Sequence, residues 1–124
     1  MSILVYNTLT GKKEEFVPRE DKKIKMYVCG ITPYDACHLG HARCYIVFDV
    51  IRRYLEYKGY QVEYIQNFTD IDDKIIKRSK ELGVNPEDLA EKYINEFLFY
   101  SEKLNLKAPK AYPRVTQMMP QILK

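Results

Sequence analysis

The amino-acid sequence predicts an α/β fold that begins with two parallel strands joined by a helix. Three observations predict it: a β-prone run at 25–29 that ends at a glycine, an amphipathic helical pattern over 41–58, and an alternating β-prone run at 61–66. A parallel pair of strands needs a crossover connection of this kind, usually a helix. The predicted centre of the fold is therefore a βαβ unit.

The composition is that of a folded protein. Of the 124 residues, 46% are apolar and 30% are charged, whereas a disordered tail carries fewer apolar residues. The net charge of +3 is compatible with an RNA partner but is too small to indicate one. The sequence shows no signal peptide and no apolar stretch of about 18 residues, and its three cysteines form no Cys-x-x-Cys pair. We therefore expect a cytoplasmic protein without a membrane partner or a disulfide framework.

The first predicted elements are a small hairpin and the long helix. Short β-prone segments at 3–6 and 15–17 flank turn residues and predict an opening hairpin within 1–22. The helix over 41–58 ends at Gly59, a residue type that commonly follows a helix. One narrow stripe of this helix is apolar at a period of 3.6 residues, and we expect it to face the core: Cys44, Val47, Phe48, Ile51 and Leu55.

Two more helices are predicted after the second strand. Thr69 and Asp70 are the predicted caps of the first, which ends near Gly83. The second starts at 85–87, where a cap residue is followed by proline at the first helical position. Each helix carries an apolar face that we expect to pack: Ile71, Ile75 and Leu82 in the first, and Leu89, Tyr93, Phe97, Tyr100 and Leu104 in the second.

The last part of the chain combines a proline-containing connection with a short helix. Pro109 and Pro113 bracket a predicted loop at 107–113. A helix is predicted over 115–124, although Pro120 lies inside it and no cap residue ends it. The sequence thus divides into three parts: an opening hairpin region (1–22), a βαβ nucleotide-binding unit (23–83) and a truncated helical segment (84–124).

A His-x-Gly-His run, formed by His38, Gly40 and His41, lies between the first strand and the long helix. Nucleotides bind at this place in α/β folds. A helix start offers unpaired backbone N–H groups and a positive dipole end to a phosphate. The imidazoles add hydrogen-bond donors, and Gly40 allows a base or ribose to approach the backbone. The run predicts an ATP site formed by these three residues, with the two histidines in the catalytic role.

Metal binding is the competing interpretation of these histidines. His38, His41 and one of Cys37 or Cys44 would supply three ligands, but their spacing matches none of the usual zinc frameworks. A single histidine is also commonly a surface or capping residue. The paired pattern favours the ATP site.

Three acidic residues also allow two interpretations. Asp70, Asp72 and Asp73 would suit a hard metal ion. Acids in the first turn of a helix are, however, what the helix dipole favours. We assign them no catalytic role.

Two longer runs carry a family resemblance. The first is Val-Cys-Gly-Ile-Thr-Pro-Tyr-Asp at 28–35, followed by Cys-His-Leu-Gly-His at 37–41; the second is Asn-Phe-Thr-Asp-Ile-Asp-Asp-Lys-Ile-Ile at 67–76. Together they closely resemble the start of cysteinyl-tRNA synthetases, class I enzymes with a Rossmann-type (HUP-like) parallel sheet and flanking helices. The resemblance covers nearly the whole chain. It implies that residues 1–124 are the amino-terminal part, the first half only, of such a catalytic domain.

The resemblance implies roles for individual residues. Cys29 is similar to the first of four zinc ligands, and in the family the zinc binds the thiolate of the substrate cysteine, a better ligand than a serine hydroxyl. Gly30, Thr32 and Thr69 are similar to positions that line the cysteine pocket, together with Cys29. Alternatives stay open for two of them: Cys29 also suits a buried strand end, and Thr69 with Asp72 can cap a helix.

The implied reaction uses L-cysteine, ATP with Mg²⁺, and tRNA(Cys), and it proceeds through cysteinyl adenylate. The sequence lacks the family's Lys-Met-Ser-Lys-Ser run, the remaining zinc ligands and an anticodon-binding domain, so we expect this chain not to charge tRNA alone. Two other functions stay open: a ligase that joins cysteine to an amino sugar through the same adenylate, and a binding fragment without turnover. We also expect self-association, because half of such a sheet leaves apolar surface uncovered.

Overall fold

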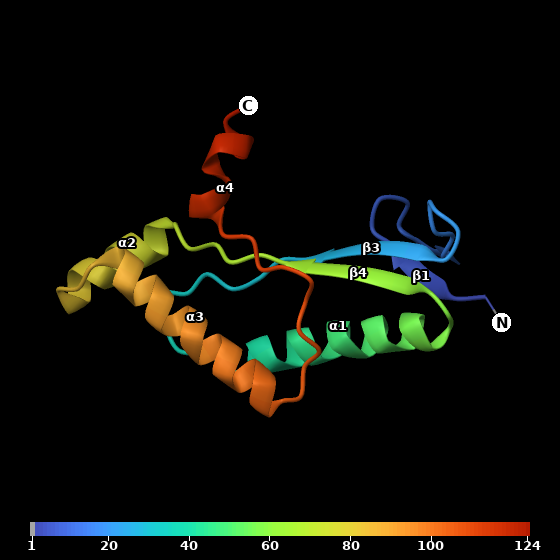
Figure 1. The fold of residues 1–124 in the computed structure, drawn as a ribbon, viewed down its shortest axis with the longest axis horizontal. Coiled ribbons are helices and arrows are strands. Elements are labelled where there is room, and N and C mark those ends of the chain that lie inside the picture. The colour runs from blue at the N-terminus through green and yellow to red at the C-terminus, as the bar shows by residue number, and fades with distance from the viewer. Residues whose placement is uncertain (1) are drawn as a thin grey trace.

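The computed structural model describes residues 2–124, and its fold is mixed α/β (Figure 1). β1 and β2 pair antiparallel, whereas β3 and β4 pair in parallel with α1 between them in the chain. The predicted βαβ unit is therefore confirmed. The elements in chain order are β1 (Leu4–Asn7), β2 (Lys12–Glu15), β3 (Lys23–Val28), α1 (Leu39–Tyr57), β4 (Gln61–Gln66), α2 (Asp73–Leu82), α3 (Pro86–Lys103) and α4 (Val115–Ile122).

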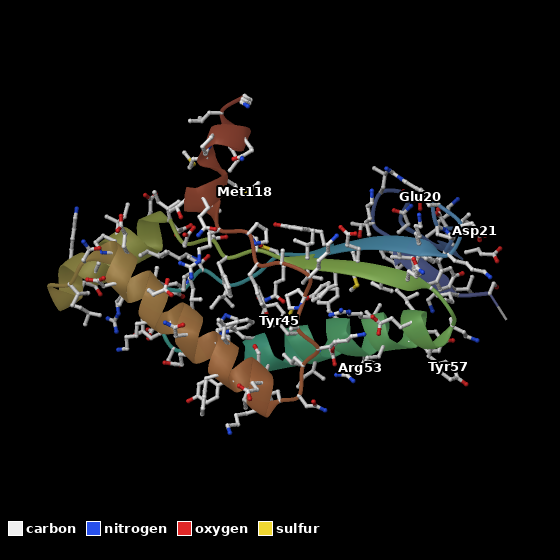
Figure 2. All side chains as sticks on the ribbon, viewed as in Figure 1. Glu20, Asp21, Tyr45, Arg53, Tyr57 and Met118 are labelled. Atoms are coloured by element: carbon white, nitrogen blue, oxygen red, sulfur yellow. The ribbon has the colours of Figure 1, made fainter. Side chains whose placement is uncertain are left out.

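The β3–β4 pair packs one face against α1, which runs alongside both strands (Figure 1). Side chains alternate along a strand, and in β3 Ile24 and Val28 are buried while Lys25 and Tyr27 are exposed. Figure 2 shows Tyr45 of α1 in the space between the helix and the strands. Every residue of β3 has a partner in β4, so both strands end at the same edge. The main core joins the two strands to α1 and α3: Val28, Ile31, Tyr45, Tyr64, Phe68, Ile94 and Phe97.

The buried face of α1 overlaps the predicted stripe only in part: Leu55 is buried and Phe48 packs against the core. Arg52 is buried, and its Nη1 donates to the carbonyl oxygens of Lys107 and Ala108 at 3.0 and 2.9 Å. Its guanidinium also lies 5.2 Å from the centre of the Tyr64 ring. The predicted stripe is defined by apolar residues alone and therefore omits Arg52. As a result it is displaced around the helix from the face that is buried. Three of its members are exposed: Cys44, Val47 and Ile51.

Part of the predicted loop at 107–113 lies beside β4 and pairs with it in parallel, as a third segment next to β3 and β4. Lys110 N–H donates to the Tyr64 carbonyl oxygen at 2.8 Å, and Phe68 N–H donates to the Pro113 carbonyl oxygen at 2.9 Å. Prolines have no N–H, so a segment that contains them pairs only at intervals. The local sequence therefore indicates a loop although the segment extends the sheet.

α2 starts later than predicted. Its N-cap is Asp72, whose Oδ1 accepts from the Lys74 N–H at 2.9 Å, so the prediction of Thr69 and Asp70 as caps is wrong. Asp70 accepts instead from the backbone N–H of Thr116 at 3.0 Å, at the start of α4. A local pattern cannot show that a carboxylate reaches a distant helix. In the predicted apolar face, one residue is buried, Ile75, and two are exposed, Ile71 and Leu82.

α3 begins where the sequence predicts and packs against α2. Asn85 is its N-cap, accepts from the Glu87 N–H at 2.7 Å, and precedes Pro86. α4 is shorter than the predicted helix, contains Pro120, has no buried residue and projects away from the other helices (Figure 1). In the predicted apolar face of α3, three residues are buried, Leu89, Tyr93 and Phe97, and two are exposed, Tyr100 and Leu104.

β1 and β2 form the predicted opening hairpin, but the second strand lies at Lys12–Glu15 instead of 15–17. Gly11 has φ +67° and its N–H donates to the Asn7 carbonyl oxygen at 2.8 Å, which closes the turn immediately before Lys12. Turn geometry sets the register of a hairpin, and here it places the charged residues of β2 opposite Leu4, Val5, Tyr6 and Asn7 of β1. In the described part of the chain, no helix is long and apolar enough to cross a membrane.

Candidate functional site

The carboxyl ends of β3 and β4 bring the predicted amino-acid pocket residues to one edge of the sheet. Cys29 and Gly30 directly follow β3, and Thr69 lies just beyond β4. The Thr69 N–H donates to the Ile31 carbonyl oxygen at 3.0 Å, which joins the two loops. Thr32, the next residue, is half-buried. Residues from two distant parts of the sequence therefore meet where ligands bind in parallel sheets.

Gly30 is required by a close approach of two backbone segments. A Cβ atom at this position would lie 1.5 Å from the Asn67 carbonyl oxygen. The Gly30 N–H donates to Asn67 Oδ1 at 2.7 Å, so this donor is already used within the protein. Asn67 Nδ2 in turn donates to Thr69 Oγ1 at 3.4 Å. Asn67 was not a predicted site residue, although its place after a strand and two residues before Thr69 was a usable signal.

His38 and His41 cap α1 in a reciprocal arrangement. His38 is the N-cap residue, and its Nδ1 accepts from the Gly40 N–H at 3.1 Å. His41 Nδ1 accepts from the His38 N–H at 3.3 Å. The two imidazole rings stack with their centres 3.9 Å apart. A capping box normally uses a hydroxyl and a carboxylate, and here two imidazoles take those places.

The hydrogen bonds indicate the tautomer of both histidines. Because each Nδ1 is an acceptor, the neutral ring carries its proton on Nε2. Burial, and next the neighbouring His38, lower the pKa of His41 below its usual value. His41 is therefore neutral at physiological pH and offers an Nε2–H donor beside a second imidazole. Neutral donors of this kind suit the oxygens of a phosphate.

Gly40 does not leave its backbone open for a ligand, as the sequence suggested. A Cβ atom on Gly40 would lie 2.8 Å from His38 Cε1, so the imidazole already occupies this space. The expected unpaired N–H groups are also engaged: Gly40 N–H bonds to His38 Nδ1, and His41 N–H donates to the His38 carbonyl oxygen at 2.9 Å. A phosphate that used the Gly40 N–H would have to displace the His38 ring. In this structure the Gly40 and His41 N–H groups are engaged, whereas the imidazole Nε2–H groups are available as donors.

The cysteines and histidines do not form a metal site with one another. Among residues 2–124, no three side chains of His, Cys, Asp or Glu are grouped so that they could hold a metal ion. The alternative chelate of His38 and His41 with Cys37 or Cys44 is therefore not formed. Cys29, the predicted zinc ligand, is exposed and not a buried strand-end residue. Its thiol is accessible, but the described residues do not by themselves fit a zinc ion.

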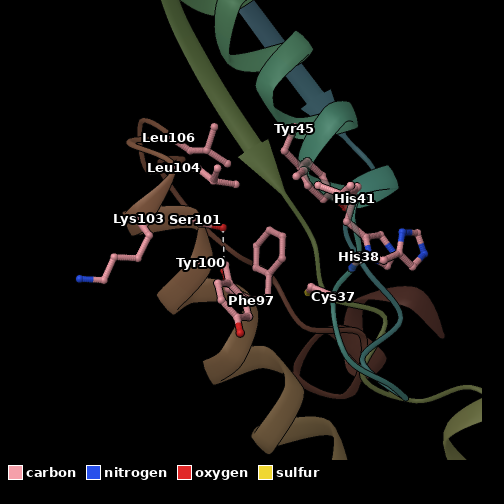
Figure 3. A pocket seen from close by; sticks show the side chains of 12 residues that line it. Cys37, His38, His41, Tyr45, Phe97, Tyr100, Ser101, Lys103, Leu104 and Leu106 are labelled. Atoms are coloured by element: carbon pink, nitrogen blue, oxygen red, sulfur yellow. Dashed lines mark hydrogen bonds between the residues drawn. The ribbon is translucent and has the colours of Figure 1, made fainter.

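A cavity of about 530 Å³ lies between the start of α1 and the end of α3 (Figure 3). Its walls are mostly apolar, and Figure 3 shows Tyr45, Phe97 and Tyr100 around it. His38 and His41 line one end. The four predicted amino-acid pocket residues are not among its lining residues. The cavity therefore adjoins the histidines but is distinct from the predicted amino-acid pocket.

Curated relatives of this chain are cysteine–tRNA ligases. The chain is 60% identical over 120 residues to that of Dehalococcoides mccartyi strain 195 and 58% identical over 123 residues to that of Thermococcus gammatolerans. These alignments cover 97% and 99% of this chain but 26% of each relative. The chain thus spans about a quarter of the length of the curated relatives it matches.

Solved structures and a family model agree with these relatives. Methionyl-tRNA synthetase of Mycobacterium tuberculosis, in complex with methionyl-adenylate, superposes with a TM-score of 0.67 at 28% sequence identity, covering 74% of this chain and 18% of that one. The model described as tRNA synthetases class I (C) catalytic domain matches residues 15–124. Since this match extends over most of the chain, the protein belongs to the family of class I (C) tRNA synthetase catalytic domains.

Proposed function

We propose that this chain contributes the phosphate-binding histidines and part of the amino-acid pocket to a cysteine–tRNA ligase. The proposed enzyme activates L-cysteine with ATP and transfers it to tRNA(Cys). The observation that carries the proposal is the stacked pair of His38 and His41 at the start of α1, the helix that connects β3 to β4. Its support is the 60% identity to a cysteine–tRNA ligase over nearly the whole chain.

In the proposed first step, the carboxylate of cysteine attacks the α-phosphorus of ATP in line. A bond forms from the carboxylate oxygen to phosphorus, the bond to the bridging oxygen breaks, and pyrophosphate leaves with the electron pair. The nucleophile is already an anion, so no general base is needed. The Nε2–H groups of His38 and His41 then act by holding phosphate oxygens and stabilising charge that grows in the transition state. Mg²⁺ would accompany ATP as part of the substrate.

Cys29, Gly30, Thr32 and Thr69 form the proposed amino-acid side of the site. The Thr69 hydroxyl accepts from Asn67, which leaves its own proton free to donate to a ligand. The Gly30 N–H is engaged, so we assign Gly30 a role in close packing and not in direct substrate contact. Cys29 remains the one proposed zinc ligand of this chain, and any zinc site would need ligands beyond those grouped in residues 2–124.

The proposal is tested with a joined enzyme, in which this chain replaces the matching quarter of the Dehalococcoides mccartyi relative. We expect cysteine-dependent exchange of pyrophosphate into ATP and charging of tRNA(Cys). The 124-residue chain alone should give neither at a comparable rate. An active relative with an inactive but folded joined enzyme, or equal activity with another amino acid, would overturn the proposed function.

Cysteine variants test the proposed pocket within the joined enzyme. Cys29→Ser should reduce bound zinc and the preference for cysteine over serine. Cys44→Ser is the matched control, because Cys44 is also exposed but lies on α1. Equal zinc loss in both variants, measured by metal analysis, would contradict the assignment of Cys29.

We also propose that the isolated chain self-associates. α1 exposes a row of large apolar side chains on its outer side, including Val50 at 59% and Tyr57 at 84% of their full exposure. Sedimentation over a range of concentrations measures this; a monomer at every concentration would contradict it. A cytoplasmic location stays part of the proposal because of the family resemblance alone.

A further inference from the structure

The peptide unit between Cys29 and Gly30 is held at both of its polar atoms by side chains from two other elements. The Cys29 carbonyl oxygen accepts from the Tyr45 hydroxyl of α1 at 3.3 Å. The Gly30 N–H donates to Asn67 Oδ1, just beyond β4, at 2.7 Å. A peptide unit is planar, so bonds at its two ends fix the orientation of the whole plane. The Cα atom of Cys29 lies in that plane, so the two hydrogen bonds fix the position from which the Cys29 side chain leaves the backbone.

Tyr45 is itself rigidly placed. Its side chain is buried, with 6% of its surface exposed, and its ring meets the Phe97 ring edge to face at 5.2 Å between centres. Tyr45 lies one helical turn after His41 on α1. It therefore ties the end of β3 to the helix that carries both histidines.

Asn67 connects the two loops of the proposed amino-acid pocket. Its Oδ1 accepts from Gly30, and its Nδ2 donates to Thr69 Oγ1 at 3.4 Å. Its own carbonyl oxygen occupies the space that a Cβ of Gly30 would need. Both ends of the amide are thus in use, and this side chain joins the loop after β3 to the loop after β4 in addition to the hydrogen bond from the Thr69 N–H to the Ile31 carbonyl oxygen.

We propose that Tyr45 and Asn67 are positioning residues for amino-acid selection, because together they clamp the Cys29–Gly30 peptide and orient Cys29 and Thr69 toward the same ligand. This inference rests on the proposed function. Neither residue needs to touch the substrate: Tyr45 acts through the Cys29 carbonyl, and Asn67 acts through Gly30 and Thr69. The expected consequence of losing the clamp is poorer recognition of cysteine with little effect on ATP.

Three variants of the joined enzyme test the clamp. Tyr45→Phe removes only the hydroxyl, and Asn67→Ala removes both hydrogen bonds of the side-chain amide. Asn67→Asp keeps an acceptor for Gly30 and serves as the conservative rescue. Tyr64→Phe is the matched control: Tyr64 is equally buried at 5% exposed, and its hydroxyl donates to Gln66 Oε1 at 2.9 Å, away from the clamped peptide.

We expect Tyr45→Phe, which loses one hydrogen bond, to lower kcat/KM for cysteine in pyrophosphate exchange by about tenfold, and Asn67→Ala, which loses two, to lower it by at least that factor. The KM for ATP should stay unchanged, and discrimination against serine should fall. Tyr64→Phe should leave both kcat/KM for cysteine and the discrimination against serine unchanged. If Tyr45→Phe retained the parent cysteine kinetics and discrimination, or changed them only as much as Tyr64→Phe, the proposal would be overturned.

Hydrogen exchange separates the clamp from the proposed function. In the joined enzyme, mass spectrometry of the peptide that contains Gly30 should show exchange of this amide about tenfold faster in Asn67→Ala than in the parent, with protection restored in Asn67→Asp. Unchanged exchange in Asn67→Ala would overturn the clamp whether or not the enzyme is active. Protection of Gly30 together with no cysteine activation by the unsubstituted joined enzyme would instead reject the proposed function.

Discussion

Gly30 and Gly40 occupy two regions of the candidate site, and each excludes a side chain for a different reason. At Gly30 the added Cβ would meet the Asn67 backbone at 1.5 Å, whereas at Gly40 it would meet the His38 imidazole at 2.8 Å. Backbone atoms in paired segments cannot move without breaking the sheet edge. The His38 side chain is exposed and can rotate.

This difference indicates that the candidate site has a rigid half around Gly30 and an adjustable half around Gly40. The loops after β3 and β4 are joined by the Gly30 N–H, which donates to Asn67 Oδ1, and by the Thr69 N–H, which donates to the Ile31 carbonyl oxygen, so the proposed amino-acid side is preorganised. The start of α1 relies on two imidazoles that cap their own helix, and a ligand can displace them. Selection of a small amino acid benefits from the first arrangement, and adjustment to a phosphate chain benefits from the second.

Gly30→Ala should give the largest effect, and it tests whether the loops after β3 and β4 are rigid. The methyl group would force the ends of β3 and β4 apart, since the contact is with a carbonyl oxygen of the backbone. We expect a loss of about 3 kcal/mol in the free energy of unfolding, in the upper range for overpacked sites. Urea denaturation of the variant and the parent chain measures it, and a loss below about 1 kcal/mol would show that this edge can adapt.

The histidines should affect rate more than binding. His38→Asn or His41→Asn in the joined enzyme should slow pyrophosphate exchange by on the order of a hundredfold, because a charge-stabilising donor is lost in the transition state. The KM for cysteine should change little, since the amino-acid side does not depend on them. Unchanged exchange rates in both variants would remove the histidines from the proposed chemistry.

Gly40→Ala tests whether the start of α1 can adjust to an added side chain. The methyl group should push the His38 ring away while helix propensity improves, so the free energy of unfolding should change by less than about 1 kcal/mol. The misplaced imidazole should still lower the exchange rate by about tenfold. Measuring the free energy of unfolding together with the exchange rate separates the two glycine variants, because only Gly30→Ala should lose much stability.

The smallest expected effect is a pH dependence of stability at His41. Its pKa is lowered in the folded chain by burial and then by His38, so the unfolded state takes up a proton at higher pH than the folded state does. Stability should therefore be highest above the ordinary histidine pKa of about 6.5 and decline as pH falls through and below it. Urea denaturation of the parent and His41→Gln between pH 5 and 8 tests this. An equal decline in both proteins would mean that His41 makes no contribution.

Local patterns in the sequence were sufficient for the parallel βαβ unit, the start of α3 at Asn85, and the placement of His38 and His41 at the beginning of α1. These features depend on periodicity, on cap residues and on chain order. Each is set within a few residues of itself, so the sequence carries it directly.

Only the tertiary structure decided which groups meet across the fold. Arg52 is buried because carbonyl oxygens of Lys107 and Ala108, more than fifty residues away, satisfy its guanidinium, so the buried face of α1 includes a residue that the predicted apolar stripe omits. Asn67 reaches Gly30, thirty-seven positions earlier, by the same kind of long-range hydrogen bond. The energy of a buried polar group depends on whether a partner lies within hydrogen-bond distance. That distance exists only after the chain has folded, whereas a hydrophobic period is already present in the sequence.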